Sequence, residues 1–179
     1  MKRWVIRLLP ALLLAVLLAG CGGEAETEGL EYEAAGECWT VTGYHGAGLE
    51  VVIPENHEGR AVTAIGKAAF EGSAIESITV GANVTEIGDR AFSGCVRLRQ
   101  VELAGDSLRR IGALAFSGCT ALEELRIPSG VAEVGACAFF RFKSDQKLVV
   151  LGDTEGWAAW WQDGCAARIE RSGQTAPPG

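Results

Sequence analysis

Apolar residues recur along residues 49–150 with a period of 22 to 24 positions, and one short motif closes each period. The motif reads IGKAAFEGS, IGDRAFSGC, IGALAFSGC and VGACAFFRF, and its phenylalanines form one column, Phe70, Phe92, Phe116 and Phe139. A unit this short cannot bury its own apolar face. The pattern therefore predicts a solenoid whose stacked units share one continuous core.

The first residues of each unit alternate between apolar and polar, which is typical of a short β-strand. Such strands, stacked about 4.8 Å apart, are expected to begin near Leu49, Ile75, Leu98, Leu122 and Leu148. The Ala-Phe segment after each motif glycine is expected to form a turn on the opposite side. The predicted fold class is an α/β repeat solenoid of about five coils, with a parallel β-sheet on one face and short helical or 3-10 turns on the other.

Alignment of the units assigns their buried positions. The inward strand positions are Ile78, Val101 and Leu125 in one column and Val80, Leu103 and Ile127 in the next. Phe92 and Phe116 have units on both sides and are expected to be fully buried. The recurrent glycines have no phosphate-loop pattern around them, so backbone geometry or close packing explains Gly66, Gly88, Gly112 and Gly135.

The N-terminal segment has the pattern of a secretory signal. MKRWVIR is basic, and the apolar run at residues 8–19 is shorter than the roughly 20 residues that span a bilayer. The run ends in LAGC, which resembles the lipobox of bacterial lipoproteins. The resemblance implies cleavage before Cys21 and a diacylglyceryl group on its thiol, and two or more acyl chains anchor a protein stably. The alternative is an ordinary secretory signal that ends near a cysteine.

Composition divides the chain into four parts. Residues 1–20 are the expected lipoprotein signal peptide, and residues 21–37 are acidic and rich in glycine and alanine, as in a flexible tether. Residues 38–171 are the repeat domain with its N- and C-terminal caps. Residues 172–179 are expected to form a disordered tail.

From about Trp39 to Ile169 the chain resembles the BspA-like, or Treponema-type, leucine-rich repeats of bacterial surface proteins. The segments VTEIGDRAFSGCVRL and IPSGVAEVGACAF follow the repeat P-x-x-V-x-x-I-G-x-x-A-F-x-G-C-x-x-L of that class. The ending LVVLGDTEGWAAWWQDG resembles its terminal helix. The resemblance implies a right-handed solenoid and extracellular interaction work, and it offers no catalytic residues to transfer.

The charge narrows the range of partners. The chain has 16 basic and 23 acidic residues, and loss of Lys2, Arg3 and Arg7 with the signal leaves 13 basic and 23 acidic residues, a net charge of −10. An acidic surface argues against binding to nucleic acid and against direct adsorption to anionic lipid. No cofactor is implied by any motif.

The cysteines allow more than one interpretation. Cys95 and Cys119 share a column, where a disulfide is geometrically tempting, but parallel side chains leave their Cβ atoms about 5 Å apart rather than the roughly 3.8 Å a disulfide prefers. A ladder of small buried thiols that bond to backbone groups is the favoured alternative. No metal site is expected, because the C-x-x-C spacing is missing and both histidines lie elsewhere. Cys137 is expected to be a free thiol, exposed or half-buried. Cys38 and Cys165 are expected at opposite ends of the solenoid, too far apart to form a disulfide. Five cysteines follow Cys21, and because this number is odd at least one is free or pairs between molecules.

Three tryptophans lie near the end of the repeat domain, at helical spacing after Asp153 and Thr154. An aromatic platform for sugar is one interpretation of Trp157, Trp160 and Trp161, and a cap over the open end of the core is the favoured one. Of the three, Trp157 is expected to stay exposed.

The outward strand positions form the candidate binding face. They are Glu50, Val52, Ser77, Thr79, Gln100, Glu102, Glu124 and Arg126, with Trp157 as a further candidate. Glu102 and Arg126 are expected to lie on consecutive strands and to form an exposed ion pair. The face is too small for tight monovalent binding, since a standard interface buries about 800 Å² per partner. Flanking turns or many anchored copies are therefore needed.

These features predict an extracytoplasmic, lipid-anchored repeat protein at a bacterial cell surface. It would present a monomeric domain to an extracellular protein or glycan, with adhesion as one such role. The alternative is a structural or envelope-associated spacer without a specific ligand. An enzyme is disfavoured, because no nucleophile, base and acid occur together.

Overall fold

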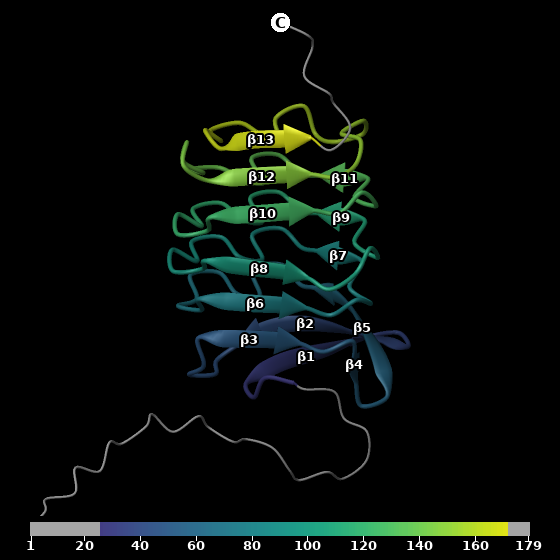
Figure 1. The fold of residues 1–179 in the computed structure, drawn as a ribbon. Helices are drawn as coiled ribbons and strands as arrows, with labels where there is room; N and C mark the ends of the chain where they lie inside the picture. The colour runs from purple at the N-terminus through teal and green to yellow at the C-terminus, as the bar shows by residue number, and fades with distance from the viewer. Residues whose placement is uncertain (1–25, 172–179) are drawn as a thin grey trace, which may run out of the picture.

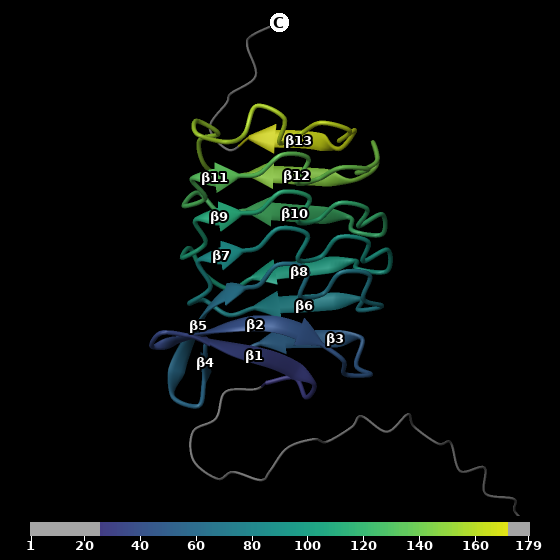
Figure 2. The same ribbon diagram turned by 180° about the vertical axis from the view of Figure 1, so that it is seen from behind.

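The computed structural model describes residues 26–171, which form 13 strands and no helix (Figure 1). The expected signal peptide, Cys21 and the expected tail at residues 172–179 lie outside the described residues. The strands are stacked in coils along one axis, as Figure 2 shows from behind. The fold is therefore the predicted solenoid, built from strands and turns.

One wall, which we call the strand face, contains one short strand from each coil. Its strands are β3 (Glu50–Ile53), β6 (Ser77–Val80), β8 (Gln100–Leu103), β10 (Glu124–Ile127), β12 (Lys147–Val150) and β13 (Arg168–Arg171). The prediction of about five coils is wrong by one, because β13 pairs in parallel register with β12. Ile169 packs against the core as the inward residues of the earlier strands do, so this segment continues the stack.

The opposite wall contains a second sheet in the order β1-β2-β5-β7-β9-β11. Its strands are β1 (Leu30–Ala35), β2 (Cys38–Tyr44), β5 (Arg60–Ile65), β7 (Glu86–Ile87), β9 (Arg110–Ile111) and β11 (Glu133–Val134), and β4 (Asn56–His57) pairs with β5. β2, β5, β7, β9 and β11 run parallel, and β1 closes the N-terminal end as an antiparallel hairpin with β2.

The expected helical or 3-10 turns are absent from residues 26–171. In each complete motif two residues have left-handed backbone angles, for example Arg90 at φ 56° and Gly94 at φ 75°. A helix needs consecutive right-handed residues, so these angles prevent one. The turns instead hydrogen-bond to each other, as when Phe92 N–H donates to Ala115 O at 2.8 Å. Sequence analysis missed this role of the column Ala68, Arg90, Leu114 and Cys137.

The phenylalanine column is confirmed as the centre of the core. The rings of Phe70, Phe92 and Phe116 stack with centroids 5.2 Å apart, and Phe139 continues the stack at 6.1 Å. All four side chains are buried. Each coil thus contributes one ring to a continuous apolar stack, as the repeat period predicts.

The motif glycines are explained by close packing between coils. A Cβ atom built on Gly112 would lie 2.4 Å from the backbone nitrogen of Asp89, and one on Gly135 would lie 2.4 Å from that of Ala113. A Cβ atom built on Gly66 would have Val41 O as its nearest neighbour, at 3.1 Å. The glycine column therefore lets successive turns approach within hydrogen-bonding distance.

At the N-terminal end, the folded domain begins before residue 38, which was the predicted boundary. Residues 30–35 lie in the expected tether but form strand β1. Leu30 and Tyr32 alternate with charged residues and pack against the core. Tyr32 also stacks on the ring of His57, with centroids 3.8 Å apart. The acidic composition hid this alternation, because Glu31 and Glu33 occupy the outward positions.

At the C-terminal end, the expected terminal helix is replaced by a sixth coil of turns. The Asp153 carboxylate accepts hydrogen bonds from Thr154 and Glu155 N–H groups, but no helix follows. Trp157 is buried and donates from Nε1 to Val131 O, so its expected exposure is wrong. Trp161 is also buried, whereas Trp160 is 63% exposed. The cap interpretation thus holds for two of the three tryptophans.

Candidate interaction surface

The strand face displays two rows of outward side chains in parallel register. One row runs through Glu50, Ser77 and Gln100, and the next through Val52, Thr79 and Glu102. Beyond them, β10, β12 and β13 continue the rows with Glu124, Lys147 and Arg168, and with Arg126, Val149 and Glu170. The structure thus brings the predicted face residues onto one wall, except Trp157, which lies in the core cap.

The charged side chains of this face are concentrated on its C-terminal half. Lys147 contacts Glu170 at 2.9 Å and Glu124 at 3.4 Å, and the hydrogen bond to Glu170 is the main cause that raises the pKa of Lys147. Arg126 pairs with Glu124 at 2.8 Å on its own strand. The expected pair between Glu102 and Arg126 is therefore wrong.

The missing pair has a structural cause, since β8 and β10 are not hydrogen-bonded neighbours. We call the facing edges of β8 (Gln100–Leu103) and β10 (Glu124–Ile127) the seam. After β8 the chain has one residue more between the inward positions Leu103 and Leu108 than after β6 or β10. In addition, Pro128 is equivalent to Ala104 and Leu151 in the neighbouring coils. The N–H groups of those two residues donate to the preceding coil, whereas proline has no N–H to donate.

A groove of about 440 Å³ lies over the seam. Its lining includes Gln100, Glu102 and Arg126 from the predicted face, and it adds Leu103, Asp106 and Leu151, which sequence analysis did not select. The sequence signals for it are the longer 24-residue interval between Phe92 and Phe116 and the proline at position 128. Of the pockets described for residues 26–171 that include strand-face residues, this groove is the larger, since the other holds about 10 Å³.

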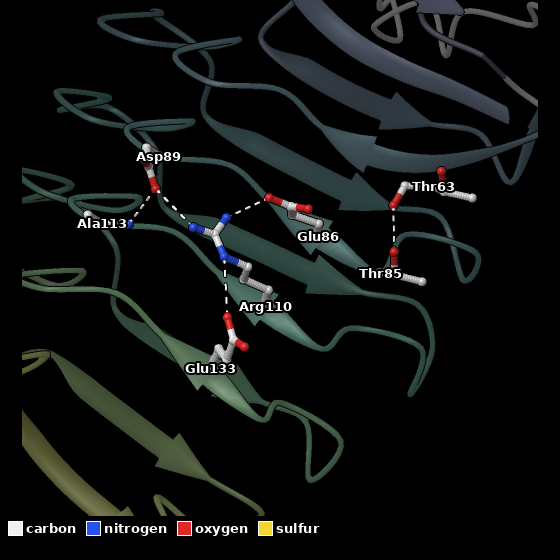
Figure 3. Close-up of polar contacts among 7 residues, drawn as sticks. All are labelled: Thr63, Thr85, Glu86, Asp89, Arg110, Ala113 and Glu133. Atoms are coloured by element: carbon white, nitrogen blue, oxygen red, sulfur yellow. Dashed lines mark hydrogen bonds and ion pairs between the residues drawn. The ribbon is translucent and has the colours of Figure 1, made fainter. Parts of the chain in front are cut away.

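The opposite wall carries an ionic cluster that sequence analysis also missed (Figure 3). Arg110 lies between Glu86 and Glu133, the residues in register with it on the two flanking strands, and 3.6 Å from Asp89. Asp89 in turn accepts a hydrogen bond from Ala113 N–H at 2.9 Å. These contacts join three consecutive coils, so the cluster serves to hold the stack together.

The cysteines act as buried hydrogen-bond donors, as the favoured interpretation predicted. Cys95 Sγ donates to Phe70 O at 2.9 Å and Cys119 Sγ donates to Phe92 O at 3.2 Å. Burial raises the pKa of the Cys95 thiol to about 11 and raises that of Cys119 as well. Both thiols are therefore protonated and unreactive at neutral pH. All five cysteines within residues 26–171 are free thiols, and Cys137 is half-buried.

Two further features are absent from the described part of the chain, a set of metal ligands and a membrane-spanning helix. Residues 26–171 contain no group of three histidine, cysteine, aspartate or glutamate side chains placed to hold a metal ion. None of those residues belongs to a helix able to cross a bilayer.

Comparison with known proteins agrees with this architecture. A family model described as BspA type leucine-rich repeat region, with six copies, matches residues 50–153. No curated protein is significantly similar in sequence. Among solved structures, the T. pallidum leucine-rich repeat protein TpLRR is 25% identical with a TM-score of 0.61, and the alignment covers 83% of this chain and 81% of that one.

Two further structures are similar. A leucine-rich repeat protein from Bacteroides capillosus is 25% identical with a TM-score of 0.57, over 83% of this chain and 98% of that one. A leucine rich cell surface protein from Faecalibacterium prausnitzii has a TM-score of 0.64 at 20% identity, over 83% of this chain and 39% of that one. The last likeness shows the fold alone.

Proposed function

The chain belongs to the BspA-type leucine-rich repeat family, and from this premise we propose that it is a binding module held outside the cytoplasm by a lipid on Cys21. The observation that carries the proposal is the strand face, where a rigid stack displays polar side chains in register. A protein or glycan at the cell surface is the proposed partner, with adhesion as one use of such binding. The Faecalibacterium prausnitzii neighbour, described as a cell surface protein, supports this location only by analogy.

The strand face suits a binding role because its side chains are held by a stack that does not need them for stability. Ser77 and Thr79 on β6 are in register with Gln100 and Glu102 on β8, while the residues between them point into the core. Substitutions on the outward rows therefore leave the apolar stack intact. The outward residues can therefore differ between proteins with different partners while the fold is kept, as is usual for binding sites on repeat proteins.

The small size of the face favours many copies acting together. Its six strands stack over only about 25 Å at the usual spacing of sheet strands. With two outward residues on each strand, a face of this length has an area below the roughly 800 Å² per partner of a standard interface. A lipid anchor would hold many copies on one membrane, which raises the effective concentration of sites without any new contact.

The anchor makes a direct prediction. Replacement of Cys21 by serine removes the thiol that would receive the diacylglyceryl group, so the variant is expected to lose membrane retention and incorporation of labelled fatty acid. Membrane fractionation and metabolic labelling measure the two effects. A variant that still sediments with membranes, together with an unlabelled wild type, would contradict lipidation at Cys21.

The binding role is tested with two matched double variants. Ser77→Arg with Thr79→Arg places two long cations on the strand face, and it is expected to reduce capture of surface proteins or polysaccharides by the immobilised protein at least tenfold. Ser93→Arg with Ser117→Arg adds the same charge to the stacked turns and should leave capture unchanged. Equal capture by wild type and both variants, or no specific capture at all, would favour the spacer without a ligand.

A further inference from the structure

The seam leaves backbone groups without strand partners. In a parallel strand, alternate residues direct their N–H and C=O groups to opposite edges. Gln100 N–H donates to Glu76 O and Ala104 N–H donates to Val80 O, so the even-numbered positions of β8 face β6. The backbone groups of Val101 and Leu103 therefore face β10, with which β8 has no strand pairing within residues 26–171.

The floor of the groove is apolar because the seam uncovers part of the core. Val101 and Leu103 are half-buried. Their equivalents in the adjacent strands are almost fully buried, with Ile78 and Val80 at 1% and 2% exposure. On the opposite wall β9 and β11 remain in register, so the two coils separate on the strand face only. Two core-facing apolar side chains are thus partly accessible at the seam.

The rim of the groove is negatively charged. Glu102 and Asp106 both line it, and neither carboxylate takes part in an ion pair with residues 26–171. Among the residues that line the groove the one cation is Arg126, which is already paired with Glu124 on its own strand. Arg109 donates to the backbone oxygens of Asp106 and Leu108. A ligand with positive charge is therefore favoured at this rim, in a chain that is acidic as a whole.

We infer that the seam binds an extended peptide segment of a partner protein, in which apolar side chains alternate with basic ones. β8 and β10 remain close neighbours across the seam, so the peptide lies along the groove over Val101 and Leu103 rather than between the two strands. Its apolar side chains cover the exposed floor, and its lysine or arginine side chains meet Glu102 and Asp106. The inference rests on the proposed binding function and specifies the partner as protein rather than glycan, because a glycan supplies neither the alternating apolar side chains nor the cations.

Amide hydrogen exchange of the full-length protein tests the open edge itself. The N–H of Leu103 faces the seam, whereas the N–H of Val80, at the same position one coil earlier, lies within the paired β6–β8 ladder. Exchange at Leu103 is expected to be at least tenfold faster than at Val80. Equal protection at the two amides would mean that the seam is closed, and it would overturn the inference.

Peptide binding tests the ligand class. A labelled Lys-Val-Lys-Val-Lys-Val peptide is expected to bind the full-length protein in fluorescence anisotropy and to slow exchange at Leu103. Peptides with serine in place of valine, or glutamate in place of lysine, should bind at least tenfold more weakly. Failure of the first peptide to bind, or binding of the neutral oligosaccharide maltohexaose alone, would overturn the inference.

Matched variants distinguish peptide binding in the groove from general attraction of a basic peptide to an acidic protein. Glu102→Gln with Asp106→Asn should weaken peptide binding at least tenfold, whereas Glu33→Gln with Asp145→Asn, which neutralises two exposed carboxylates outside the groove, should change it less than twofold. Equal losses in the two variants would overturn the inference. If Ser77→Arg with Thr79→Arg abolishes surface capture while the groove variant does not, the proposed function stands and the seam is not its site.

Discussion

Replacing Phe92 by alanine is expected to lower the free energy of unfolding by about 3–5 kcal/mol. Phe92 is fully buried, and its ring lies between those of Phe70 and Phe116, with centroids 5.2 Å away on each side. The loss combines the transfer energy of a buried aromatic side chain with a cavity that the stacked turns cannot fill, because hydrogen bonds between coils hold their spacing. Denaturant unfolding of the wild type and the variant measures the change.

Two companion variants sharpen this result. Phe92→Leu keeps most of the side-chain volume and should cost clearly less than Phe92→Ala, since a smaller cavity remains. Phe139→Ala should also cost less, because Phe139 lies next to the cap, where its neighbours Phe142 and Trp161 pack edge-on and can adjust. A loss below about 1 kcal/mol for Phe92→Ala would contradict the stacked register.

The second large effect is expected at the glycine column. Gly112→Ala should lower the free energy of unfolding by about 3 kcal/mol or more, at the upper end of what overpacking costs. The new Cβ atom would lie 2.4 Å from Asp89 N and 2.6 Å from Gly88 C, which are backbone atoms of the preceding coil. The coils would have to separate, which would weaken the hydrogen bond from Gly112 N–H to Ile87 O. Denaturant unfolding is again the measurement.

Gly66→Ala is the matched control in the same column. Its Cβ atom would have no contact closer than 3.1 Å, because β2 replaces a full coil on that side. Alanine also reduces the conformational entropy of the unfolded chain, which favours folding by about 0.4–1 kcal/mol. The net change should be small, within about 1 kcal/mol. Similar losses for Gly66→Ala and Gly112→Ala would show that close approach of the coils is not what requires glycine.

The sequence by itself determined the stack and its core. A repeat period of 22 to 24 residues puts the same side chain at the same place in every coil, so burial of Phe92 or Cys95 could be read from their columns. Inward and outward strand positions followed from alternation for the same reason. The resemblance of residues 18–21 to a lipobox belongs to the sequence alone, since Cys21 lies outside the described residues.

Only the tertiary structure decided how each coil bonds to the next. The left-handed backbone at Arg90 and Leu114 is stabilised by hydrogen bonds to the following coil, so residues that favour helices form stacked turns instead. Gln146 is buried because its amide donates to Cys119 O and Leu122 O, which no local pattern indicates.

Positions where the repeat is interrupted were also decided by the tertiary structure. Trp157 is covered and Trp160 exposed because the last coil has a neighbour on one side only, and no column existed from which to predict either. The seam arises where an inserted residue and Pro128 coincide across two coils. Periodicity encodes what the coils share, whereas a break in the pairing depends on the fit between two particular neighbours.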